Sequence, residues 1–306
     1  MSMRLSPVVA ASLFTLAPVL AVAQPFPFER TLQVGASPSL DVASGSGQVT
    51  VRAGSGPTIV VKGTVTVNSG WGAPANAAEL ARQVAANPPI TQVGDMVQVG
   101  RLTDETTRKA VSISYDITVP TAASVAASSG SGAVSVSGVN GQVKATAGSG
   151  DVTVARIGGE VDARSGSGDI SVTDARKGAS LSTGSGDIVA SLNGSGAVKA
   201  STGSGDISLK GVVGLLSAST GSGSIGVEGK PTGEWKVSSA SGDVRIAVPA
   251  DQGFTLDART TSGSLEVGAE GVTVEKSPGR RRAAGAVRGG GPTLRLSTAS
   301  GDIAVK

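Results

Sequence analysis

A glycine recurs through the second half of this chain at steps of 18 or 19 residues, and this period constrains the fold more than any other feature. Each glycine precedes an aspartate or a residue that replaces it, as in "SGSGDISV" (165–172) and "TGSGDIVA" (183–190). The regular members of the series are Gly132, Gly150, Gly168, Gly186, Gly205, Gly223 and Gly242. The series continues less regularly to Gly263 and Gly301. Such a period is typical of a repeat protein in which each repeat packs on its neighbours.

Each repeat contains two short segments in which apolar and polar residues alternate. A second glycine series, from Gly141 to Gly253 with steps of 18 to 20, precedes one of these segments. Alternation with a period of two predicts strands with one apolar side. In "GEVDARSGSGDISV", the residues expected on that side are Val161, Ala163, Ile170 and Val172. Four small apolar residues cannot form a core alone, but stacked repeats bury them in a continuous column.

The period and the alternation together predict an all-β, single-stranded parallel β-solenoid with about 18–19 residues per coil. Helical repeats are excluded because glycine is unfavourable inside helices and the alternation has the wrong period. An antiparallel sandwich would need hairpin turns and would not keep this register over so many residues. Right-handed winding is expected because parallel connections favour it. Glycine and serine are expected at the corners, where close backbone approach excludes larger residues.

Composition supports a narrow interior and excludes several chemistries. Glycine accounts for 45 of 306 residues and aromatic residues for only 2%, so Val, Ala, Ile and Leu must build the core. The absence of His and Cys excludes disulfides, thiol chemistry, a Ser-His-Asp triad and the usual zinc sites. The net charge of +3 is too small to indicate nucleic-acid binding. No cofactor is implied.

Residues 1–23 have the features of a signal peptide. Arg4 supplies the positive charge, and the apolar run that follows is broken by two prolines and ends in the small residues "AVA". No positive stop-transfer flank follows, so we predict cleavage between Ala23 and Gln24 instead of a membrane anchor. The mature chain is expected to be exported to the periplasm, the cell surface or the medium, with no membrane span.

We expect one β-solenoid domain over residues 24–306. Its N-terminal strands are predicted at 29–68, an excursion at 69–108 and regular coils at 109–306. Within the coils, the glycine, proline and arginine content of residues 275–292 predicts a flexible loop.

The excursion is predicted to contain one short helix and a hairpin. "NAAELARQVAAN" (76–87) places Leu80 and Val84 four residues apart and ends before two prolines. "PITQVGDMVQVGRL" reads as two strands joined at Gly94 and Asp95. We expect the helix and the hairpin to cover part of the solenoid.

Residues 113–152, "ISYDITVPTAASVAASSGSGAVSVSGVNGQVKATAGSGDV", resemble a secreted bacterial β-strand-repeat family of unknown function that is labelled "putative adhesin". The shared features are the strand ending in "ITVP", the "SGSG" corners and the closing "LSTASGDI". The resemblance covers most of residues 29–306. It implies a β-solenoid, an exported location and no established enzyme activity, and it supplies no functional residues.

The aspartates that follow the corner glycines are the main candidate site, and the first four lie in successive repeats at Asp151, Asp169, Asp187 and Asp206. Stacking would align them. One interpretation is a calcium ladder, because Ca²⁺ prefers carboxylate oxygens. The other is a structural role in which each carboxylate accepts backbone N–H bonds at its corner. The period is 18, whereas calcium-binding β-helix repeats have nine residues, so we favour the structural role and predict no metal site.

Two further features are candidates for binding. Arg280, Arg281 and Arg282 would contact acidic polysaccharide, lipopolysaccharide or membrane headgroups, or would lie in a solvated loop. Trp235 would stack on a sugar or pack beneath a loop.

The expected function is that of an exported, non-catalytic, adhesin-like surface or periplasmic protein that binds a protein or glycan of the cell envelope. The alternative is a purely structural envelope scaffold that pairs with another protein through a ladder face or a terminal edge. A polysaccharide-acting β-helix enzyme is less consistent with the sequence, because such enzymes cluster their acids in a cleft. The aspartates here are evenly spaced, and we predict no catalytic residues.

Overall fold

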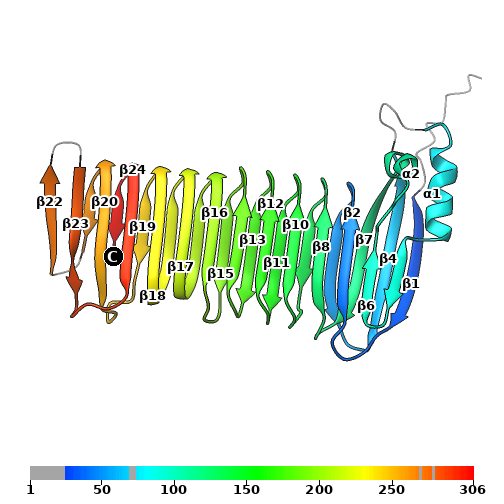
Figure 1. Cartoon of the computed structure of the whole chain (residues 1–306), viewed down its shortest axis with the longest axis horizontal. Coiled ribbons are helices and arrows are strands. Elements are labelled where there is room, and N and C mark those ends of the chain that lie inside the picture. The colour runs from blue at the N-terminus through cyan, green and yellow to red at the C-terminus, as the bar shows by residue number, and fades with distance from the viewer. Residues whose placement is uncertain (1–24, 69–73, 269–270, 278–279) are drawn as a thin grey trace, which may run out of the picture.

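A computed structural model describes residues 25–68, 74–268, 271–277 and 280–306. The predicted signal peptide and its cleavage site at Ala23 and Gln24 lie outside these residues. The described residues form 25 strands and two short helices, and the strands build one elongated stack (Figure 1). The prediction of an all-β, solenoid-like repeat fold is confirmed, with mostly parallel strand pairs.

The strands form two walls that face each other. Neighbours in the first wall are parallel. In spatial order, the first wall contains β6 (Met96–Val99), β2 (Ser39–Ser44), β8 (Ser124–Ser129), β10 (Val143–Ala147), β12 (Val161–Ser165), β14 (Ala179–Thr183), β16 (Val198–Ser204), the second halves of β17 (Ile207–Ser222) and β18 (Ile225–Ser241), β24 (Thr293–Ser300) and β20 (Phe254–Ser262).

The second wall is parallel in the same way. In spatial order, it contains β7 (Val111–Pro120), β3 (Val49–Gly54), β9 (Val134–Ser137), β11 (Val152–Ile157), β13 (Ile170–Ala175), β15 (Ile188–Leu192), the first halves of β17 and β18, β19 (Val244–Ala247), β25 (Ile303–Val305) and β21 (Leu265–Val267).

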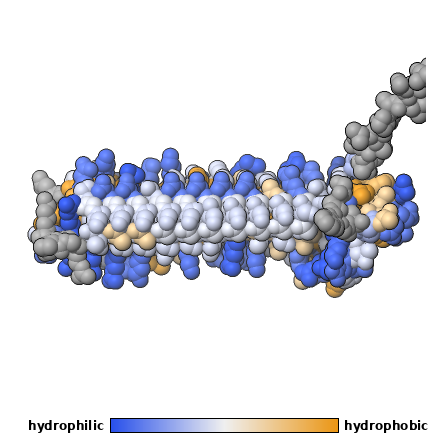
Figure 2. Space-filling view, turned by 90° about the horizontal axis from the view of Figure 1, so that it is seen from above, coloured by the Kyte–Doolittle hydropathy of each residue, from blue (hydrophilic) through white to orange (hydrophobic). Residues whose placement is uncertain are grey.

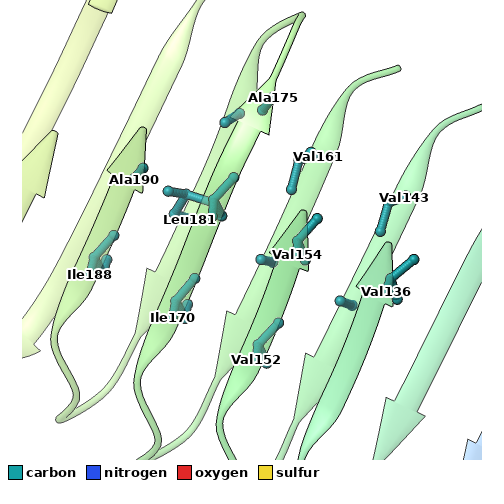
Figure 3. Close-up of a cluster of buried hydrophobic side chains, with 14 of the residues drawn as sticks. Val136, Val143, Val152, Val154, Val161, Ile170, Ala175, Leu181, Ile188 and Ala190 are labelled. Atoms are coloured by element: carbon teal, nitrogen blue, oxygen red, sulfur yellow. The ribbon is translucent and has the colours of Figure 1, made fainter. Parts of the chain in front are cut away.

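The core lies between the two walls, as the alternation predicts. Val161, Ala163, Ile170 and Val172 are all almost completely buried. Each faces its equivalent in the next coil, for example Val152 beside Ile170 and then Ile188 (Figure 3). Because every coil contributes the same few small side chains, the stack buries one continuous apolar column.

Chain order and stacking order differ at both ends of the stack. The first coil of the chain, β2 and β3, lies between β6/β7 on one side and β8/β9 on the other. The last coil, β24 and β25, lies between β18/β19 and β20/β21. Both terminal coils are therefore held by neighbours on each side.

The N-terminal end of the stack is closed by antiparallel strands and helices. β1 (Phe26–Gln33) pairs with β4 (Thr58–Val67), which pairs with β7. Helix α1 (Ala77–Ala86) buries Ala77, Ala81 and Val84, and it lies beside β1 and β4 (Figure 1). The predicted helix and the hairpin of β5 (Ile90–Val93) with β6 are confirmed.

The prediction of a single helix is wrong, because α2 (Glu105–Ala110) is a second one. Six residues are too few to give a recognisable apolar period. The helix is instead fixed by its cap, since the Asp104 carboxylate accepts the Thr107 N–H at 2.7 Å.

The predicted flexible loop at 275–292 is also wrong over most of its length. β22 (Val272–Ser277) and β23 (Arg280–Val287) form an antiparallel pair, and β23 also pairs with β20. Ala283 and Val287 on β23 are buried, so apolar alternation outweighs the loop-like composition. Among the described residues of 275–292, only 288–292 lack strand structure, and there Arg288, Gly289 and Gly290 take positive φ values of 50°, 83° and 84° as the chain crosses to β24.

Candidate functional site

The aspartates of the predicted ladder connect successive coils. The Oδ1 atom of each accepts a backbone N–H from the next coil, at distances of 2.7–2.9 Å. The pairs are Asp151 with Asp169, Asp169 with Asp187, Asp187 with Asp206, and Asp206 with Ser224. The carboxylates therefore act as acceptors between coils instead of within their own turns. Within the described ranges, no group of three or more acidic residues has the arrangement of a metal site.

A column of buried hydroxyl groups lies inside the same corners. The Thr183 hydroxyl donates to the carbonyl oxygen of Gly168 at 2.9 Å and accepts the N–H of Gly186 at 3.2 Å. In other coils, a side-chain hydroxyl donates in the same way to the glycine carbonyl in the corner of the adjacent coil. These hydroxyls belong to Ser129, Ser165, Thr202, Thr220, Ser239, Thr298 and Thr260. Ala147 occupies this position in one coil, which therefore lacks the hydroxyl. These corners are structural, since their polar groups satisfy one another.

The edge of the stack that carries these corners is of intermediate hydropathy. Figure 2 looks down on it and shows a pale row along the stack between hydrophilic flanks. The row consists of Gly-Ser-Gly corners such as 148–150 and 166–168.

The arginine run lies on β23 and its described side chains have specific contacts. Arg282 Nε donates to Asp257 Oδ1 at 3.1 Å, and Arg259 Nη2 lies 2.8 Å from Asp257 Oδ2. Partial burial raises the pKa of Asp257, but the hydrogen bonds from Arg259 and Arg282 outweigh it and hold that pKa below its ordinary value. Arg281 donates to the Gly263 carbonyl. Arg280 also lies on β23, so the run is part of the sheet.

The hypothesis that Trp235 stacks on a sugar is wrong. The side chain is 0% exposed, and its Nε1–H donates to the carbonyl oxygen of Gly214 at 2.9 Å. It lies in the inward column between Leu216 and Leu294.

A shallow groove on the outer side of the first wall is a candidate surface for a ligand. It has a volume of about 810 Å³ and runs across the coils of β10 to β18. Small residues, including Gly178, Ser180 and Ser217, form its floor. A second depression of about 440 Å³ continues it to Arg259 and Arg295 and shares Ser217 with it.

Charged side chains line the groove. Glu234 accepts ion pairs from Lys236 at 3.2 Å and from Arg295 at 3.0 Å. Lys177 and Lys199 also line it, and no ion pair between described residues includes either of them. Glu160 and Asp162 line the groove as well, so it offers ammonium groups, hydroxyls and carboxylates to a ligand that lies along the stack.

The sequence analysis did not identify the groove residues. The outward positions of the strands were visible from the alternation, as in "AVKAS" around Lys199 and "EWKVS" around Lys236. Their alignment into a groove depends on which coils stack on each other, and the local pattern does not show this order.

These features define a solenoid-like all-β repeat protein with a grooved outer wall. The family model described as Toastrack DUF4097 matches residues 40–306, and the chain belongs to this family. No curated protein matches the chain.

Several solved structures are similar. A "putative cell adhesion protein" from Clostridium sporogenes is 11% identical, with 92% of this chain and 99% of that chain covered and a TM-score of 0.23. A "putative adhesin" from Bacteroides fragilis is 16% identical, with 73% and 97% covered and a TM-score of 0.43. A "putative adhesin" from Parabacteroides distasonis is 12% identical, with 92% and 97% covered and a TM-score of 0.37.

None of the helices in the described part of the chain has the length and apolar character needed to cross a bilayer.

Proposed function

We propose that this chain is an exported, non-catalytic binding protein of the cell envelope, and that its ligand lies in the groove of the first wall. The observation that supports this most strongly is the alignment of groove residues from successive coils, from Gln142 to Lys236. A ligand in such a groove is extended along the stack and contacts a similar set of groups in each coil. A polymer such as an envelope glycan has that shape.

The chemistry of the groove favours hydroxyl-rich ligands, because ammonium groups, hydroxyls and carboxylates, including those of Glu160 and Asp162, line it together. Lys177 and Lys199 offer ammonium donors, and Ser180 and Ser217 offer hydroxyls. No described aromatic side chain is exposed, so recognition depends on hydrogen bonds and charge instead of ring stacking.

The absence of catalysis is part of the proposal. The chain contains no His or Cys, and the four regular ladder aspartates each direct an oxygen to a backbone N–H. These carboxylates form one row along the stack, bonded from coil to coil, instead of a pair that lies on either side of one scissile bond.

We also propose the finer description of the fold as a single-stranded β-solenoid with right-handed winding. Parallel neighbours joined by short corners support it, because such connections are right-handed in almost all proteins. An experimental electron-density map that traced left-handed coils would contradict it.

A glycan array with envelope polysaccharides tests the binding function. Ser217→Tyr places a ring in the groove, and Ser171→Tyr places the same ring on the exposed side of the second wall as the matched control. We expect the wild-type protein to bind a polysaccharide on the array, Ser217→Tyr to abolish this binding and Ser171→Tyr to preserve it. Loss of binding only in Ser171→Tyr would exclude the groove, and release of sugar fragments by the wild-type protein would contradict the non-catalytic role.

A scaffold that pairs with another protein is the second candidate, and one observation favours it. Val93 and Met96 lie opposite each other at the tip of the β5–β6 hairpin and are 79% and 50% exposed. Exposed apolar side chains at one tip suit a protein contact. A pull-down from envelope extracts that yields the same partner with wild type and with Val93→Ser/Met96→Ser would contradict this site.

A further inference from the structure

The last coil at the N-terminal end of the stack contains a tyrosine where the other coils have Val, Ile or Leu. Tyr115 on β7 aligns with Val49, which aligns with Val134 and then with Val152. The column otherwise contains small aliphatic side chains, and this is the chain's one tyrosine. A phenol ring in this position needs a separate explanation.

The hydroxyl of Tyr115 is buried and has no hydrogen-bond partner among the described residues. The side chain is only 2% exposed, and its ring packs edge-on against Phe28 with the centroids 6.3 Å apart. A phenylalanine would make the same packing contacts without burying an unsatisfied donor, which costs free energy. Such a group in a folded protein indicates a missing partner.

A cavity of about 410 Å³ lies beside this ring. In most other coils a three-residue Gly-Ser-Gly corner joins the two walls, but residues 100–110, including α2, replace it here. Gly100 and Tyr115 both line the cavity, and a Cβ added to Gly100 would lie 3.0 Å from the Tyr115 hydroxyl oxygen. The hydroxyl therefore lies close to Gly100 behind the inner wall of the cavity, where it is buried.

The remaining walls combine apolar and cationic groups. Leu102, Val111 and Ile113 supply apolar surface, and Arg101 and Arg108 supply guanidinium groups. Arg101 is paired with Asp41, whereas none of the ion pairs between described residues includes Arg108. The volume is within the range of small-molecule sites.

We propose that this cavity binds a small organic acid whose carboxylate contacts Arg108 and whose far end carries an oxygen that accepts a hydrogen bond from Tyr115. The apolar middle of the molecule would lie against Leu102, Val111 and Ile113. Burial raises the pKa of Tyr115, so its hydroxyl stays protonated and serves as the donor. The site is separate from the groove of the first wall.

Three probes of equal chain length test each end of the ligand. 6-Hydroxyhexanoate has both polar ends, hexanoate lacks the distal oxygen, and 6-amino-1-hexanol replaces the carboxylate with an ammonium group. Isothermal titration of the full mature chain should give the strongest binding with 6-hydroxyhexanoate, weaker binding with hexanoate and none with the amine. Equal binding of all three, or no saturable binding of 6-hydroxyhexanoate, would overturn the proposal.

The variant Tyr115→Phe tests whether the hydroxyl binds a ligand or stabilises the fold. Without ligand, the variant should melt at the same temperature as wild type or higher, because the unsatisfied group is gone. It should bind 6-hydroxyhexanoate about fivefold to tenfold more weakly, down to the affinity for hexanoate, while hexanoate binding is unchanged. A lower melting temperature would assign the hydroxyl to the fold and would overturn its role in binding.

Arg108→Gln tests the carboxylate contact, with Arg82→Gln on the exposed side of α1 as its control. Hexanoate binding should fall in the first variant and not in the second. Equal affinities in wild type and Arg108→Gln would exclude Arg108 from the site.

Discussion

The Thr298 hydroxyl donates to the carbonyl oxygen of Gly242 at 2.9 Å, although the two residues are 56 positions apart in the chain. The equivalent bond in the middle of the stack, from Thr183 to Gly168, spans 15 positions. The geometry is the same because β24, in the last coil, stacks directly on β18. The chain first forms β20 to β23 farther along the stack, and β24 then returns to lie between β18 and β20.

Insertion of the last coil between two others should protect its strands from local opening. The N–H of Lys306 donates to the Ile246 carbonyl at 2.9 Å, and the N–H of Ile303 donates to the Ser264 carbonyl at 3.0 Å. Amide groups that are bonded to neighbouring coils on both sides exchange slowly. We expect native-state hydrogen exchange at Ile303 to be as slow as at Ile188 in the middle of the stack, whereas the edge strand β22 exchanges quickly. Rapid exchange at Ile303 would show that the coil opens independently.

Ala147→Ser should stabilise the protein by restoring the missing hydroxyl of the buried column. The new hydroxyl would donate to the Gly132 carbonyl and accept the Gly150 N–H, as its neighbours do in their coils. A satisfied buried hydrogen bond contributes about 1 kcal/mol. Chemical denaturation measures the change. Ala145→Ser is the control, because this inward position has no corner beside it, and it should lower the stability.

Gly168→Val should destabilise the stack, and Gly168→Ala should do so to a smaller extent. A Cβ on Gly168 would overlap the carbonyl group of Gly150 in the previous coil, so the two coils must separate. Overpacking of this kind costs about 1–3 kcal/mol. The matched control is Gly45→Ala, whose Cβ would meet nothing within 4 Å. A thermal melt by circular dichroism that ranks the two alanine variants equally would contradict close approach as the reason for glycine.

Trp235→Ala should cost about 3–5 kcal/mol, since the ring is completely buried between coils. Trp235→Phe keeps much of the packing but loses the hydrogen bond to Gly214, for a cost of about 1 kcal/mol. Urea denaturation compares both variants with Leu215→Ala, whose side chain is 54% exposed and should matter little. An unchanged stability in Trp235→Ala would mean that the ring is not part of the core.

Acid should weaken the C-terminal end of the stack through Asp302. The Ser264 N–H donates to its Oδ1 at 2.7 Å and lowers the pKa of Asp302 below its ordinary value of 3.8. A carboxylate with a lowered pKa in the folded state stabilises the protein above pH 3.8, and this contribution is lost as the pH falls through the folded-state pKa. Between pH 5 and pH 3, denaturation midpoints should fall less in Asp302→Asn than in wild type.

Asp251→Asn, in an exposed turn, is the control for this pH dependence. It should follow the wild-type curve. If Asp302→Asn also follows that curve, the carboxylate does not link the two outer coils.

The inward residues of each repeat were predictable because strand alternation is local. Val161 and Ile170 are buried, and Asp162 and Ser171 face outward, as two-residue periodicity requires. The corner aspartates were also located correctly in their repeats. Their hydrogen-bond donors were not, because the N–H that Asp169 Oδ1 accepts belongs to Asp187 in another coil. The burial of Trp235 between coils and the strand that carries Arg281 and Arg282 were not predictable, because composition does not show which segments pair with β18 and β20.

By itself, the sequence determined the repeat length, the strands and the side of each strand that is buried, because these depend on neighbouring residues. Only the tertiary structure decided which coil stacks on which. The coil with Leu294 and Ile303 has the same inward pattern as the coil with Leu256 and Leu265, so the local pattern permits either one to follow β18. The order is fixed by contacts between segments distant in the chain, including the crossing at Gly289 and Gly290, and the groove and the Tyr115 cavity depend on the same long-range stacking.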